Sequence, residues 1–149
     1  MENNNTVKST VDTVDSINNL DSVNRLDKMI YLASPYSHSI RAVRNDRFRL
    51  VARWAARLRV EYPGYFFYSP VCHSHPIAEY MGNYNDGRYW LRECMVMMPW
   101  FDELWVLKLD GWGVSSGIRE EVARAEGLYM PVVYIDAGGD TDSGNDDND

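Results

Sequence analysis

Hydrophobic residues in the middle of the chain occur in short runs that alternate with longer segments of helical periodicity. The short runs are rich in β-branched and aromatic residues, which predicts β-strands at 29–33, 65–68, 103–109 and 132–135. The periodic segments predict helices at 41–61, 88–98 and 117–127, with an irregular segment at 70–87.

This β-α-β-α-β-α-β order predicts an α/β fold, a flavodoxin-like or Rossmann-like three-layer sandwich with a mostly parallel sheet of four to five strands. Ligands of such sheets bind beyond the carboxyl ends of the strands. We therefore expect the loops at 34–40, 69–75 and 110–117, and the segment from 136 onward, to converge on one site.

The two ends of the chain differ from this central domain, which we place at 29–136. Residues 1–28 are polar, and their hydrophobic residues recur every three positions, which matches neither a helix nor a strand. We expect a flexible leader there, with a short helix packed on a neighbour as the alternative. Residues 137–149 are rich in Gly, Asp, Asn and Ser and predict a disordered acidic tail.

The net charge of −7 is concentrated in the ends. Residues 29–135 hold twelve basic and eleven acidic side chains, a net charge of about +1, which argues against a nucleic-acid partner. No run resembles a signal peptide or approaches ~18 apolar residues, so we expect a cytoplasmic protein with no membrane partner. The two cysteines make no disulfide framework.

The segment 107–125 carries the strongest chemical signal. A buried strand leads into a Gly/Ser loop and a helix that we expect to begin near Gly117. Ser115, Ser116 and Gly117 would then present hydroxyls and free backbone N–H groups at a helix N-terminus, which suits an anion such as phosphate. No Walker-type lysine is present, and an ordinary helix cap is the alternative.

Two adjacent glutamates on this helix point in different directions. On a helical wheel that starts at Ile118, Glu121 falls at about 300°, within the apolar arc, and Glu120 falls near 200°, away from it. A Gly117 cap would make Glu120 a capping-box residue, so we interpret it as structural. The direction of Glu121 does not suit a solvated cap, so a functional and a structural role both stay open.

Other candidate residues have equally plain alternatives. Arg41 and Arg44 would either extend into solvent or face an anion, whereas the arginines from Arg47 to Arg59 read as a solvated helix face. The spacing around Cys72 and His73 fits no usual zinc pattern, so we expect neither a metal nor a cofactor. Tyr36 would cover a planar ligand or pack in the core.

Three segments, 30–37, 101–110 and 116–125, with His73-Ser-His-Pro-Ile-Ala78 between them, resemble the nucleoside 2-deoxyribosyltransferase superfamily, most closely an uncharacterised small single-domain branch. The resemblance implies that Glu121 is the catalytic nucleophile. It also implies that Ser115, where the transferases have aspartate, binds a 5′-phosphate together with Ser116 and Gly117. Ser34, Tyr36, His73 and Asp102 would complete the substrate site. Cys94 stands where the family often has an aspartate near the leaving base, with Glu93 beside it.

The resemblance implies an enzyme that hydrolyses the N-glycosidic bond of a (deoxy)nucleoside 5′-monophosphate through a glycosyl-enzyme. One alternative is a nucleoside 2-deoxyribosyltransferase that exchanges bases. An alternative of another class is a non-catalytic nucleotide-binding sensor or interaction domain. The expected partner is a small nucleotide or nucleoside, and the family resemblance further implies a homo-oligomer, a dimer or larger.

Overall fold

The computed structural model describes residues 26–82 and 87–138. Most of the predicted leader and almost all of the predicted tail lie outside the described residues. The elements are β1 (Lys28–Ala33), α2 (Arg41–Glu61), β2 (Tyr65–Tyr68), α3 (Pro70–Tyr80), α4 (Gly87–Met97), the short 3₁₀ helix η1 (Met98–Trp100), β3 (Glu103–Lys108), the 3₁₀ helix η2 (Trp112–Val114), α5 (Ser116–Gly127) and β4 (Val132–Asp136).

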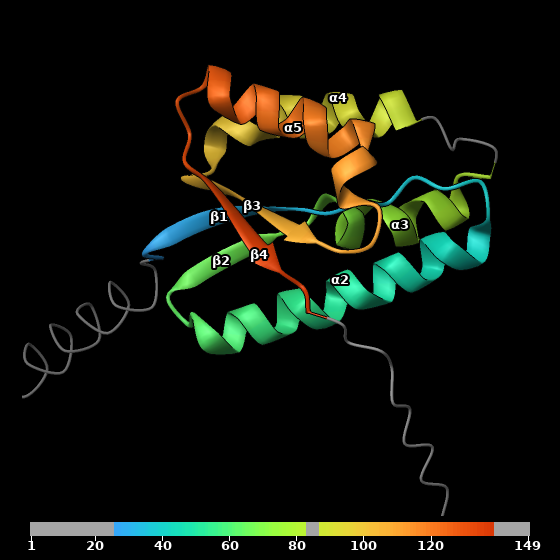
Figure 1. The fold of residues 1–149 in the computed structure, drawn as a ribbon, viewed down its shortest axis with the longest axis horizontal. Helices are drawn as coiled ribbons and strands as arrows, with labels where there is room; N and C mark the ends of the chain where they lie inside the picture. Colours follow the sequence, from blue (N-terminus) through green and yellow to red (C-terminus); the bar gives the residue numbers. More distant parts are fainter. Residues whose placement is uncertain (1–25, 83–86, 139–149) are drawn as a thin grey trace, which may run out of the picture.

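The four strands form one parallel sheet in the order β2-β1-β3-β4. In the central strand β1, Ile30 lies opposite Phe67 of β2 on one side and Glu103 of β3 on the other. Helices cover both faces of the sheet (Figure 1). The predicted α/β, flavodoxin-like three-layer fold is therefore confirmed, with four parallel strands in the described part of the chain.

Alternation along β1 divides the core into two layers, because successive side chains of a strand point to opposite faces. Ile30 and Leu32 pack against α2 and α3, whereas Tyr31 and Ala33 pack against α4 and α5. In Figure 1, α4 and α5 lie above the sheet and α2 and α3 below it. A strand buried on both faces has few polar positions, which explains the nearly continuous apolar runs of the sequence.

The segment 70–87, which we expected to be irregular, begins with an eleven-residue helix, α3. Ser69 caps this helix, because its side chain accepts a hydrogen bond from the backbone N–H of Cys72. Pro70 occupies the first turn, where a missing N–H costs nothing. The prediction failed because Pro76 lies inside the helix, where proline usually ends one.

Helix α5 begins one residue earlier than the sequence suggested. Ser115 is its N-cap, and the Ser115 Oγ accepts a hydrogen bond from the backbone N–H of Ile118 at 3.3 Å. The expected Gly117 cap is therefore wrong, and Glu120 is not the third helical residue that a capping box requires. Within residues 26–82 and 87–138, no helix is long and apolar enough to span a bilayer.

Candidate active site

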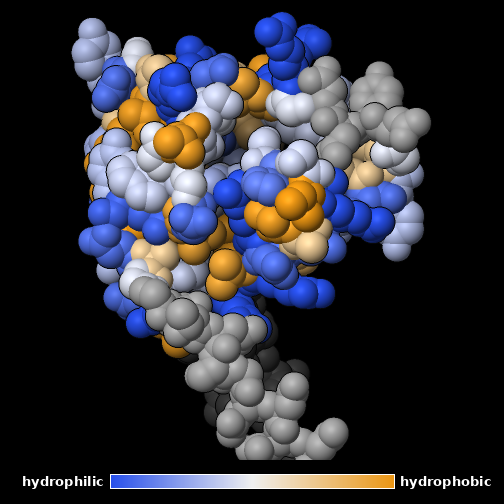
Figure 2. Space-filling view, turned by 45° about the vertical axis from the view of Figure 1, so that its right-hand side comes forward, coloured by the Kyte–Doolittle hydropathy of each residue, from blue (hydrophilic) through white to orange (hydrophobic). Residues whose placement is uncertain are grey.

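A cavity of about 450 Å³ opens at the carboxyl ends of the strands, where the loops after β1 and β3 meet the starts of α3 and α5. Figure 2 turns this end of the molecule toward the viewer, and the surface there is hollowed. The lining includes Ser34, Tyr36, Ser37, His38 and Arg44 from the β1 side, Pro70, Val71 and Ser74 from α3, Gly87, Arg88, Trp90, Leu91 and Cys94 from α4, and Ser115, Ser116, Gly117, Glu120 and Glu121 from the α5 side.

The position of this cavity follows from the strand order. The chain leaves β1 toward β2 on one side and returns to β3 on the other side of β1, so the order reverses between β1 and β3. The loops that follow these two neighbouring strands lead to helices on opposite faces, which leaves a crevice between them. The crevice is the site that the predicted fold implied.

Glu121 points from α5 into this cavity, and only 7% of the residue is exposed. The Tyr31 hydroxyl donates a hydrogen bond to its Oε1 atom at 2.7 Å. Burial raises the pKa of Glu121 to about 7, and the hydrogen bond from Tyr31 opposes that effect. The carboxyl group is thus held by one oxygen in a dry environment and ionises near neutral pH.

Tyr31 is the partner of Glu121 that the sequence analysis did not identify. It lies in the middle of β1, and its side chain is fully buried against α4 and α5. An aromatic residue within a buried strand looks like an ordinary core residue, but a buried tyrosine hydroxyl usually has a hydrogen-bond partner. Side chains alternate between the two faces of the sheet along β1, which puts Tyr31 on the face that α5 covers. The helical wheel directs Glu121 toward the same face, so the two patterns together indicate that these residues meet.

Cys94 lies beside the Tyr31 hydroxyl on the same wall of the cavity. Burial raises the pKa of the Cys94 thiol to about 11, so the thiol is neutral at physiological pH. Burial likewise raises the pKa of Tyr31. Tyr31 and Cys94 therefore keep their protons at neutral pH. Of the three neighbours Tyr31, Cys94 and Glu121, only Glu121 ionises near pH 7.

The start of α5 forms the polar side of the cavity with Ser115, Ser116 and Gly117. The Ser115 Oγ uses a lone pair to cap the helix, which leaves its hydroxyl proton for a ligand. The first backbone N–H groups of a helix have no intrahelical partner, so those of Ser116 and Gly117 are suited to an anion. A Cβ at Gly117 would have Ser115 Oγ, at 3.8 Å, as its nearest neighbour, an ordinary contact. The protein's own packing therefore leaves space beside Gly117.

Two further expected residues, Ser34 and Tyr36, also line the cavity. The Ser34 Oγ is buried and has no hydrogen-bond partner in the described part of the chain. A buried hydroxyl normally has a partner, so the Ser34 Oγ is an unsatisfied polar atom at the edge of the cavity. The Tyr36 hydroxyl lies 2.7 Å from Nδ1 of His75, a buried residue of α3.

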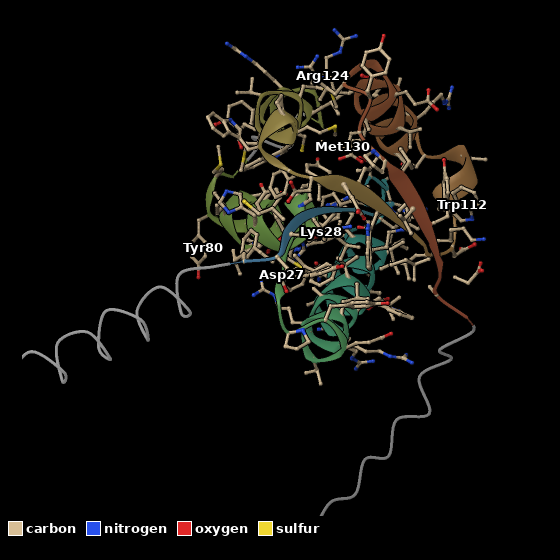
Figure 3. The ribbon with its side chains drawn as sticks, turned by 90° about the vertical axis from the view of Figure 1, so that its left-hand side faces the viewer. Asp27, Lys28, Tyr80, Trp112, Arg124 and Met130 are labelled. Atoms are coloured by element: carbon tan, nitrogen blue, oxygen red, sulfur yellow. The ribbon has the colours of Figure 1, made fainter. Side chains whose placement is uncertain are left out.

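His73 and Asp102 do not join this cavity. His73 is exposed on α3, and its ring packs at 6.0 Å from that of Tyr68. Asp102 lies before β3, where its carboxylate accepts a 2.7 Å hydrogen bond from the backbone N–H of Met29. That is the amino end of the sheet, which Figure 3 shows around Lys28 and Met130. Asp102 ties the starts of two strands together, at the end of the sheet opposite the cavity.

The arginines of α2 divide differently from our expectation. Arg41 forms an exposed ion pair with Glu79, whereas Arg44 lines the cavity and donates to the backbone oxygens of His38 and Ser39. Arg47, which we expected to be solvated, donates to the Ser37 carbonyl at 2.9 Å and to the Asp110 carbonyl at 3.4 Å. It thereby joins the two loops that frame the cavity.

Metal-binding side chains do not gather in the described part of the chain: no group of three His, Cys, Asp or Glu residues there is placed to hold an ion. Cys72 and Cys94 are both free thiols. The hydrogen-bond donors that face the cavity are hydroxyls, backbone amides and guanidinium groups, which suit an oxyanion, and Glu120 and Glu121 add two carboxyl groups to the lining.

A family model described as "Domain of unknown function (DUF1937)" matches residues 28–137. The match covers most of the chain, so the chain belongs to this family. A comparison with curated proteins found no match. The family description names no activity, and the resemblance to nucleoside 2-deoxyribosyltransferases therefore stays a prediction.

Proposed function

We propose that this member of the DUF1937 family hydrolyses the N-glycosidic bond of a (deoxy)nucleoside 5′-monophosphate, with Glu121 as the nucleophile. One observation carries the proposal: a buried carboxylate, held at one oxygen by the Tyr31 hydroxyl, lies in the same cavity as the start of α5. A nucleophile and an anion-binding helix terminus in one cavity suit a substrate that carries a phosphate and an electrophilic carbon.

In the first step, the free Oε2 atom of Glu121 attacks C1′ of the sugar while the C1′–N bond breaks, and the bonding electrons leave with the base. Tyr31 holds Oε1, so the second oxygen is the one available to react. Burial removes water from the carboxylate and so makes it a stronger nucleophile once it is ionised.

In the second step, a water molecule attacks C1′ of the glycosyl-enzyme and the bond to Glu121 breaks, which restores the carboxylate. The proton that this water loses balances the proton that the departed base takes up from solvent. The products are the sugar 5-phosphate and the free base. If a second base entered in place of water, the same intermediate would lead to base exchange, so the acceptor decides between the two reactions.

The phosphate preference follows from the charge and the donors of the α5 start. Ser115 donates a hydrogen bond to the phosphate, whereas a carboxylate at this position would repel it. The backbone N–H groups of Ser116 and Gly117 add two donors, and the helix dipole favours the negative charge. Arg44 supplies a positive charge on the same cavity.

Base release is the test. The wild-type protein is incubated with a panel of ribo- and deoxyribonucleoside 5′-monophosphates and with the matching nucleosides, and the free base is measured by mass spectrometry. We expect release from at least one monophosphate, faster than from its nucleoside, and no new nucleotide when a second base is added. Release from nucleosides alone would contradict the phosphate site, and a new nucleotide would identify a transferase.

A further inference from the structure

A second pair of polar side chains, the half-buried Tyr36 and the buried His75, lies at the cavity and is not used by the proposed reaction. Tyr36 lines the cavity from the loop after β1, and His75 lies behind it on α3 with 7% of its surface exposed. The Tyr36 Oη and His75 Nδ1 atoms are 2.7 Å apart, the distance of a short hydrogen bond.

Aromatic packing holds the His75 ring in one orientation. The ring stacks on Phe48 of α2, with centroids 4.3 Å apart and an angle of 18° between the planes. It also meets the ring of Tyr36 edge-on, with centroids 5.7 Å apart. A ring packed in this way cannot turn freely, so the direction in which Nδ1 points is determined by the fold.

The charges around the pair indicate which atom donates. Burial lowers the pKa of His75, an effect that Glu79 opposes and Arg44 and Arg41 reinforce, so the ring is neutral and keeps one acceptor nitrogen. Burial raises the pKa of Tyr36, while Arg44 lowers it. Arg44 acts on the Tyr36 oxygen as a hydrogen-bond donor, because a guanidinium group can only donate. That arrangement favours the form in which Tyr36 donates its proton to Nδ1 of His75.

We propose that His75 is a positioning residue that accepts the Tyr36 proton at Nδ1 and so presents the Tyr36 oxygen to the cavity as a hydrogen-bond acceptor for a sugar hydroxyl. The identity of the ligand rests on the proposed function. Tyr36 then determines specificity, because a sugar that lacks the matching hydroxyl leaves the oxygen without its donor.

The test measures binding rather than turnover, by calorimetry in a Glu121→Gln background that does not consume the ligand. The ligands are one ribonucleoside 5′-monophosphate and its 2′-deoxy and 3′-deoxy forms. Tyr36→Phe removes the hydroxyl and His75→Leu removes the acceptor nitrogen. His75→Asn keeps an acceptor near the place of Nδ1, and Tyr80→Phe, at a residue 93% exposed, is the matched control.

We expect removal of one sugar hydroxyl to weaken binding about five- to tenfold in the parent, in Tyr80→Phe and in His75→Asn. The same removal should change binding less than twofold in Tyr36→Phe and in His75→Leu. An equal loss in all the variants, no loss in the parent, or no binding of any of the three ligands would overturn the inference.

The two proposals fail separately. If the wild-type protein releases no base but the hydroxyl discrimination depends on Tyr36 and His75, the proposed function fails and the positioning role stands. If base is released and the discrimination is the same in every variant, the hydrolase stands and the positioning role fails. His75→Asn is also a control for helix structure, because it changes the same position of α3 as His75→Leu but keeps a hydrogen-bond acceptor.

Discussion

At the scale of single residues, the account depends on the environment of one carboxyl group. Glu121 lies on the buried face of α5 beside Tyr31 and Cys94, and the only hydrogen bond to its side chain in the described part of the chain comes from Tyr31. A carboxylate with one donor is stabilised less than it would be in water, which is why burial dominates its pKa. The same environment that makes the Glu121 carboxylate reactive therefore lowers the free energy of unfolding when the carboxyl group is ionised.

This cost predicts that Glu121→Gln stabilises the protein at alkaline pH. The pKa of Glu121 rises from 4.5 to about 7 on folding, so the folded state binds the proton more tightly. The contribution of Glu121 to stability is therefore fully present below pH 4.5 and is lost as the pH rises through 7. We expect the variant to gain about 3 kcal/mol over the wild type between pH 4.5 and pH 8, measured by urea unfolding at both values. A difference between the two proteins that does not change with pH would contradict the buried, ionisable carboxyl group.

A second prediction concerns the hydrogen bond from Tyr31. Tyr31→Phe removes the donor that lowers the pKa of Glu121, so the pKa should rise above its present value of about 7. We expect the acid side of the pH–rate profile, and the Glu121 carboxyl signal in an NMR titration, to move to higher pH. Tyr80→Phe, far from the cavity at an exposed position, should leave both unchanged. An unchanged titration in Tyr31→Phe would mean that the hydrogen bond does not hold the carboxylate.

The sequence allowed Glu121, Ser34, Tyr36, Ser115, Ser116 and Gly117 to be placed in one cavity, because each follows a strand end or faces inward on a helix wheel. It could not assign His75 over His73, because the helix that orients them was not predicted. Asp102 was misplaced for a different reason. Its role came from the family resemblance, and its place directly before β3 puts it at the amino end of the parallel sheet, opposite the cavity.

At the scale of elements, the loops after β1 and β3 form the frame of the cavity, and Arg47 of α2 links them. Helix propensity does not reveal such a link, since an arginine on a polar face normally extends into solvent. Gly111 lies at the contact, with a φ of +82° and a position at which an added Cβ would come within 2.9 Å of the Arg47 Nη2 atom.

Gly111→Ala should therefore disturb the frame. The left-handed backbone costs a non-glycine residue about 1–2 kcal/mol, and the new methyl group displaces the Arg47 guanidinium from the Asp110 carbonyl. We expect a loss of about 1–2 kcal/mol in urea unfolding and weaker nucleotide binding. Gly113→Ala is the matched control, since nothing lies within 4 Å of its Cβ. Equal stability of the two variants would show that neither the left-handed backbone at position 111 nor the Arg47 contact stabilises the protein.

Gly117→Ala separates binding from stability at the start of α5. The added Cβ meets no protein atom closer than 3.8 Å, and alanine is the better helix former, so the free energy of unfolding should stay equal or rise by up to about 1 kcal/mol. The methyl group would occupy the space beside the backbone amides that we assign to the phosphate. We expect weaker binding of a nucleoside monophosphate by calorimetry, together with unchanged binding of the matching nucleoside. Unchanged binding of both ligands would show that the phosphate does not bind beside Gly117 at the start of α5.

At the scale of the whole molecule, the strand order creates the cavity at the reversal between β1 and β3. The order of elements was predictable because each strand is a short apolar run and most helices show helical periodicity. The residues around the cavity were harder to predict, because α3 packs on one face of the sheet and α4 on the other. Those approaches depend on packing between segments far apart in the sequence, which local patterns do not encode.

The central claim, that Glu121 is the nucleophile of an N-glycosidase, is tested most directly by the rate of base release. The wild type, Glu121→Gln and Glu126→Gln, an exposed glutamate of the same helix, are compared on the monophosphate that the wild type cleaves fastest. We predict a loss of about 10³-fold or more in Glu121→Gln and a rate near that of the wild type in Glu126→Gln. No base release by the wild type, or equal rates in the wild type and Glu121→Gln, would contradict the account.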